Sequence, residues 1–127
     1  MRPHENLDVW KKAVDFTVEI YRLTETFPKE EKFGLTSQIR RASVSIAANI
    51  AEGAGRKSER DFLRFLSMAQ GSASEVETEV LIAFRLSYLD EGTYLEMLSR
   101  MDDIGRMITG LCNYLLGKLE GKTSIDE

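Results

Sequence analysis

The sequence predicts an all-α protein, an up-down-up-down four-helix bundle. Apolar residues recur at steps of three and four over four separate stretches, which is the period of one helix face. No stretch of any length alternates apolar and polar residues with the period of two that is typical of strands. Both prolines lie outside the four stretches, and the connections between them are short. Short connections place neighbouring helices antiparallel, so we expect one bundle domain over residues 1–127.

The first helix is expected at residues 7–26, after a loose segment at residues 1–6. Pro28 ends it, because the residue before a proline is biased away from the helical conformation. In the connector that follows, Phe33 and Leu35 are expected to plug the end of the bundle. The apolar stripe predicted for the first helix is Trp10, Val14, Thr17, Tyr21 and Thr24, widened by Leu7, Ala13 and Ile20.

The second helix is expected at residues 37–53, with Thr36 or Ser37 as its N-cap. Gly53 and Gly55 can adopt the left-handed conformation that ends a helix. Most side chains of this helix are small, so other helices can approach it closely from several sides, and we expect it to be central. Its predicted buried face is Ile39, Ala42, Ser43, Ile46, Asn49, Ile50 and Gly53.

The third helix is expected at residues 59–89 and the fourth at residues 94–119, with frayed residues 120–127 after it. Ser58 and Asp61 resemble a capping box, and Thr93 with Glu96 forms a full one. Gly71 lies in the middle of the third helix, where glycine costs about 1 kcal/mol against alanine. We therefore expect a close helix contact at Gly71.

Surplus apolar residues lie off the main stripes of the second and third helices. Such surplus tends to mark an interface, so we expect a homo-oligomer. The residues concerned are Val44, Ala48, Ala51, Leu63, Leu81 and Phe84.

A long ordered motif resembles the signature of the four-helix-bundle proteins named for intervening sequences of 23S ribosomal RNA. It comprises Gln38-Ile39-Arg40-Arg41-Ala42-Ser43-Val44-Ser45-Ile46, then Asn49-Ile50-Ala51-Glu52-Gly53, then Gly55-Arg56. The resemblance covers roughly residues 7–116. The residues that carry it as a structural motif are Asn49, Glu52, Gly53, Gly55, Gly71, Glu75 and Glu77.

The resemblance implies a ring-shaped homopentamer. A similar protein, the accessory variability determinant of diversity-generating retroelements, works with a reverse transcriptase and binds nucleic acid through basic surfaces. The resemblance therefore implies RNA or DNA as a partner, together with a reverse transcriptase or another protein.

Composition favours a cytoplasmic protein. The chain is 43% hydrophobic and 30% charged, as is usual for a globular domain. Its single cysteine, Cys112, cannot form an intrachain disulfide, which suits a reducing compartment. No secretory signal and no apolar stretch of about 18 residues is present, so we expect no membrane partner.

The reactive residues do not converge in a pattern typical of an enzyme. The only histidine, His4, lies in the N-terminal segment, and no Glu-x-x-His pair of a di-iron bundle occurs. Cys112 is expected to be a small core residue. Gly53 and Gly55 follow no strand and lack the Gly-Lys-Ser/Thr of a phosphate-binding loop. We expect no enzymatic activity, no cofactor and no metal.

Three carboxylates, Glu75, Glu77 and Glu79, alternate along the third helix. One interpretation is a solvated face on which one or two acids meet Arg40 or Arg41. The other is a buried or intersubunit ion pair, which is costly unless fully partnered. Asn49, on the apolar side of the second helix, is expected to bond a backbone group of the third helix or a neighbouring subunit.

A basic cluster spans the second helix and the turn after it. Between residues 40 and 64, six basic residues face the three acids Glu52, Glu59 and Asp61, a local charge of +3 in a chain of net charge -4. The charges are either solvated and paired with these acids, or they contact phosphate. Base stacking is not expected of this cluster. The candidate nucleic-acid contacts are Arg40, Arg41, Arg56, Lys57, Arg60 and Arg64.

Two functions follow from these features. The first is a non-enzymatic, oligomeric, nucleic-acid-associated accessory factor. The alternative is a protein-interaction scaffold that binds no nucleic acid.

Overall fold

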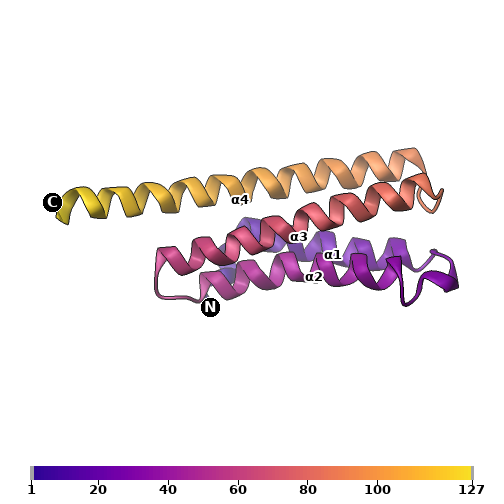
Figure 1. Ribbon diagram of the computed structural model, residues 1–127, viewed down its shortest axis with the longest axis horizontal. Helices are drawn as coiled ribbons and strands as arrows, with labels where there is room; N and C mark the ends of the chain where they lie inside the picture. The colour runs from indigo at the N-terminus through magenta and orange to yellow at the C-terminus, as the bar shows by residue number, and fades with distance from the viewer. Residues whose placement is uncertain (1, 127) are drawn as a thin grey trace.

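Four helices form an antiparallel bundle in this computed structural model, which describes residues 2–126 and the side chains of residues 2–121. Each helix runs opposite to the one before it (Figure 1), and no strand occurs among the described residues. The predicted fold class is therefore confirmed. The elements are η1 (Pro3–Asn6), α1 (Asp8–Thr24), η2 (Lys29–Glu31), α2 (Leu35–Ala54), α3 (Glu59–Arg85) and α4 (Glu91–Asp126).

The N-terminal ends of α2 and α3 are fixed by different groups. α2 begins at Leu35, whose N–H donates to Glu31 Oε1 at 3.2 Å, so the predicted cap at Thr36 or Ser37 is wrong. α3 begins after Ser58, whose Oγ accepts from the N–H of Asp61 at 3.1 Å, as predicted. The Glu31 side chain of η2 thus takes the place of the threonine or serine cap that was predicted for α2.

α4 is longer than predicted at both ends. It begins at Glu91 because Asp90 Oδ1 accepts from the N–H of Thr93 at 2.7 Å, so Asp90 is the cap in place of Thr93. The same hydrogen bond lowers the pKa of Asp90. The helix continues to Asp126, through most of the segment 120–127 that was expected to fray, and Glu127 lies outside the described residues. Figure 1 shows the end of α4 extending beyond the turn between α2 and α3.

The face of α1 that enters the core is rotated from the predicted one. Phe16 is only 1% exposed, whereas Tyr21 of the predicted stripe is 41% exposed. α1 carries apolar residues on two sides, and burying Phe16 removes a large apolar area from water. The buried residues of α1 are Val9, Ala13, Phe16, Ile20 and Thr24.

The core lies along the predicted face of α2, where only Asn49 of the predicted set is half-buried rather than buried. Ile46 and Leu66 are at most 1% exposed. Phe27 closes one end of the bundle with Leu35, and its ring lies 5.3 Å from that of Tyr88. Phe33 is 90% exposed, so the prediction that it plugs this end is wrong. The core residues of α3 and α4 include Ala69, Val76, Val80, Ala83, Met97, Met101, Ile104 and Ile108.

Neither Gly53 nor Gly55 adopts a left-handed conformation, because every described glycine has a negative φ. Gly55 ends α2 with a φ of -83°, and Gly53 is buried within the helix. Gly71 has no neighbour within 4 Å of the position that a Cβ would take, so the close contact predicted there is also wrong. Of these glycines, only Gly53 is required by packing.

Candidate nucleic-acid interface

The six predicted basic residues do not form one patch. Arg40 and Arg41 lie near the start of α2, whereas Arg56, Lys57, Arg60 and Arg64 lie after its end or on α3. From Arg40 to the end of α2 at Ala54, the helix rises by roughly 21 Å. The local charge of +3 is therefore divided between the two ends of the α2–α3 hairpin.

Arg40 is held by contacts within the chain. Its Nε donates to Thr24 Oγ1 at 2.8 Å, and one terminal nitrogen donates to the carbonyl of Tyr21 at 3.2 Å. The guanidinium also lies over the Tyr21 ring, 4.6 Å from its centroid. These contacts join α1 to α2, so Arg40 has a structural role.

The turn cluster, which we define as Arg56, Lys57, Arg60 and Arg64, is built around an aromatic ring. The guanidinium carbons of Arg56 and Arg64 lie 4.8 Å and 4.6 Å from the centroid of Phe65. Arg56 also pairs with Glu52, and Arg64 Nε lies 3.7 Å from Asp61 Oδ1. Two of the four cations are thus fixed in place and partly neutralised.

Lys57 and Arg60 are the free members of the turn cluster. Both side chains are exposed, and no carboxylate of the described residues lies within 4.0 Å of either charge. They flank the first turn of α3, where helix geometry favours anions. A phosphate group could approach them without displacing an ion pair.

A polar seam joins α2 to α3. Asn49 Nδ2 donates to the carbonyl and to the hydroxyl of Ser45, at 2.9 Å and 3.0 Å. Ser72 Oγ on α3 donates to Ser45 Oγ at 2.9 Å. Asn49 therefore bonds within its own helix, which corrects the prediction of a backbone partner on the third helix. The hydrogen bond to α3 is made by Ser72, which is not among the predicted site residues.

The three carboxylates of α3 have different environments. Glu75 and Glu77 are exposed, but Glu79 is 8% exposed, and its Oε1 has no hydrogen-bond partner among the residues that the structure describes. No ion pair joins any of the three acids to Arg40 or Arg41 within the described part of the chain. The predicted structural motif includes Glu75 and Glu77 but not Glu79. The spacing of Ser72, Glu75 and Glu79 is the signal that could have shown a shared face.

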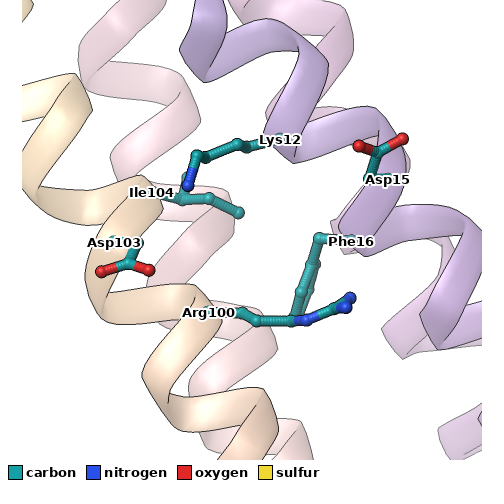
Figure 2. A pocket seen from close by; sticks show the side chains of 6 residues that line it. All are labelled: Lys12, Asp15, Phe16, Arg100, Asp103 and Ile104. Carbon is teal, nitrogen blue, oxygen red and sulfur yellow. The ribbon is translucent and has the colours of Figure 1, made fainter.

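Figure 2 shows a cleft between α1 and α4 whose rim is charged. Lys12 extends from α1 toward α4, and Arg100 extends from α4 toward α1, over the buried side chains of Phe16 and Ile104. Arg100 Nε lies 3.9 Å from Glu96. The lining mixes two bases with two acids and contains neither histidine nor cysteine, so we see no nucleophile–base pair in it.

The residues considered for chemistry lie apart. Cys112 is half-buried against the core, and burial raises the pKa of its thiol, which disfavours the nucleophilic thiolate. The His4 ring makes an edge contact with Trp10, with centroids 4.8 Å apart. Among the described residues, no group of three or more His, Cys, Asp or Glu side chains could hold a metal ion. No described helix is both long enough and apolar enough to cross a membrane.

These features define an all-helical bundle with a cationic turn cluster at one end and a buried carboxylate, Glu79, on α3. Residues 5–110 match the 23S rRNA-intervening sequence protein family, and the chain belongs to that family. The resemblance seen in the sequence is thus confirmed.

A solved structure supports the same assignment. It is a protein of unknown function from the S23 ribosomal protein family of Bacteroides thetaiotaomicron, with 25% sequence identity and a TM-score of 0.76. The alignment covers 83% of this chain and 95% of that chain. No curated protein matches the sequence.

Proposed function

We propose that this protein is a non-enzymatic homo-oligomer that binds the phosphate backbone of RNA or DNA through its turn cluster, as an accessory factor. The observation that carries the proposal is the pair Lys57 and Arg60, which are exposed beside the start of α3 and have no carboxylate partner among the described residues. Lysine and arginine at such a position suit phosphate contacts, which fix a protein on nucleic acid without reading sequence.

The contact surface is narrower than the six residues of the sequence motif. Arg40 is engaged with α1, and Arg41 lies with Arg40 at the other end of the hairpin. Arg56 and Arg64 support the turn cluster through Phe65 and add positive potential. Lys57 and Arg60 are left to make the direct contacts.

Oligomerisation strengthens the binding of nucleic acid by this small cluster. One chain carries a net charge of -4, which opposes binding to a polyanion. A homopentameric ring, which the family resemblance implies, repeats the turn cluster on each subunit. Several weak phosphate contacts then act together, and avidity overcomes the net charge.

A gel shift on structured RNA and on duplex DNA tests the proposal. The wild type is compared at low salt with Lys57→Ala/Arg60→Ala and with a control that removes the same charge on α1, Lys11→Ala/Lys12→Ala. We expect the turn variant to lose binding and the control to keep it, and binding to fall steeply with salt because phosphate contacts release counterions. If both variants keep their oligomeric state and shift the nucleic acid equally, binding occurs on another surface.

Light scattering tests the assembly itself. We expect a mass several times that of one chain, with five copies as the proposed number. A monomer mass over a wide concentration range would reject the oligomer and with it the avidity argument.

The alternative is a protein-interaction scaffold whose partner is a reverse transcriptase or another protein. The exposed aromatic Phe33 favours it, because a large exposed apolar side chain on a turn is typical of an interface anchor. Absence of any gel shift by the wild type at low salt, on either nucleic acid, would make this function the better one.

A further inference from the structure

Glu79 is an anomaly in the packing of α3. Its side chain is 8% exposed, and Oε1 is shielded from solvent without a hydrogen-bond donor. Buried carboxylates are normally paired or hydrogen-bonded, because removing a charge from water is costly. The structure of one chain therefore leaves this group incomplete.

The cleft in front of Glu79 lacks a cation that engages it. The titratable groups that face Glu79 are Glu75 from α3 and Arg41 from α2, and the rest of the lining is uncharged. Arg41 donates to Ser37 Oγ at 3.4 Å and pairs with neither acid. Burial, followed by repulsion from Glu75, raises the pKa of Glu79 to about 7. The uncharged lining residues are Gln38, Ala42, Ser45 and Ser72.

A groove adjoins this cleft, and Arg41 lines both. Two further cations, Lys32 and Arg40, line the groove, and Arg40 is held by its contacts to α1. Three large side chains of the groove are exposed: Phe33 by 90%, Val44 by 44% and Tyr21 by 41%. Apolar anchors beside an unpartnered charge are the composition of a protein interface, with a hydrophobic centre and a few specific polar contacts. The cleft and the groove together make one continuous surface on the flank of α2.

We propose that this surface docks a second copy of this chain, and that a lysine or arginine side chain of that copy enters the cleft and pairs with Glu79. The proposal rests on the homo-oligomer proposed above and names the site that assembly completes. A ring requires head-to-tail contacts between two different patches of each chain. The cleft in front of Glu79 is one such patch, and the 17 lysine and arginine residues of the chain supply complementary charge for the other.

Assembly through Glu79 depends on pH. The incoming cation prefers the ionised carboxylate, whereas the free chain holds Glu79 protonated below about pH 7. Association therefore tightens as the pH rises from 6 to 8, by roughly tenfold for each contact.

The experiment compares wild type, Glu79→Gln and Glu77→Gln by sedimentation and light scattering of the full chain at pH 6 and pH 8. Glu77 is the matched control, because it is an exposed carboxylate of α3 that faces α4. Glu79→Gln is isosteric, and circular dichroism checks that it folds. We expect it to weaken association at pH 8 by roughly tenfold to a hundredfold and to abolish the pH dependence. Glu77→Gln is expected to behave as the wild type.

Three results would overturn the proposal, and they are distinguishable. A wild type that is monomeric at both pH values removes the oligomer and this site together. An oligomeric wild type whose association Glu79→Gln leaves unchanged removes only the site. In Arg41→Gln the cleft loses a charge that repels the incoming cation, so association should be unchanged or tighter. If Arg41→Gln instead weakens association as much as Glu79→Gln, the partner of Glu79 is Arg41 of its own chain.

Discussion

A Cβ atom at Gly53 would lie 2.8 Å from the Cβ atom of Phe65, closer than two such atoms approach in proteins. The same atom would lie 2.9 Å from Phe62 Cδ1. Gly53 therefore sets how closely the end of α2 approaches the start of α3. Because Phe65 lies beneath Arg56 and Arg64, this contact also positions the turn cluster.

Gly53→Ala is expected to destabilise the protein. Alanine favours a helix interior by about 1 kcal/mol, but the clash with Phe65 involves atoms fixed to the backbone, and overpacking costs about 1 to 3 kcal/mol. We expect a net loss on the order of 1 kcal/mol in urea denaturation. A variant as stable as the wild type would show that α2 and α3 separate without cost.

Gly71→Ala and Gly110→Ala are the matched controls and should stabilise. Apart from the backbone of the same helix and the adjacent residues, no described atom lies within 4 Å of the Cβ position at either residue, so alanine meets no obstacle. Each change should raise the free energy of unfolding by up to about 1 kcal/mol. A loss of stability at Gly71 would mean that another molecule covers this position.

Ile46→Asp should unfold the protein or leave it insoluble. Ile46 is 1% exposed, and the substitution places an unpaired charge in the core. Val44→Asp is the control, because Val44 lies two residues away and is 44% exposed. Circular dichroism and solubility are expected to show a folded Val44→Asp and no folded Ile46→Asp. A soluble, helical Ile46→Asp would contradict the core described above.

Glu79→Gln should change the pH dependence of stability in the dissociated chain. The pKa of Glu79 is about 7 when folded and near 4.5 when unfolded, so the folded state holds a proton that the unfolded state lacks between these values. Stability contributed by Glu79 is therefore complete below about pH 4.5 and is lost as the pH rises toward 7.

Glutamine stays neutral, so the variant is expected to be more stable than the wild type at pH 8. The expected gain is on the order of 1 to 3 kcal/mol, since a tenfold change in proton binding corresponds to about 1.4 kcal/mol. At pH 4.5 the two proteins should be nearly equal. Thermal melts at both pH values, at a protein concentration below that of association, measure this difference in stability. If the difference between the two proteins is the same at both pH values, Glu79 is accessible to water.

The fold could be predicted from the sequence because helix signals are local. The three- and four-residue period of α2, the cap at Ser58 and the position of Pro28 each act within a few residues of the chain. The three- and four-residue steps from Ile39 to Gly53 predicted the buried face of α2, and the motif from Gln38 to Arg56 carried the resemblance to the family. The wrong caps also have a local cause. Glu31 and Asp90, which accept the first hydrogen bonds of α2 and α4, precede these helices. Thr36 and Thr93 fit the sequence pattern of a cap equally well but lie inside the helices.

The candidate site was decided by tertiary packing. α1 has two apolar sides, and only the fit of Phe16 into the bundle selects the side that turns inward. Arg40 and Arg56 belong to one motif, but Arg40 lies near the start of α2 and Arg56 follows its end, so the helix separates them. The burial of Glu79 between two helices, in contrast to the exposed Glu75 and Glu77, depends on how α3 is rotated against α2. Rotation and distance between helices result from the packing of all four helices at once, so no short stretch of the sequence specifies them.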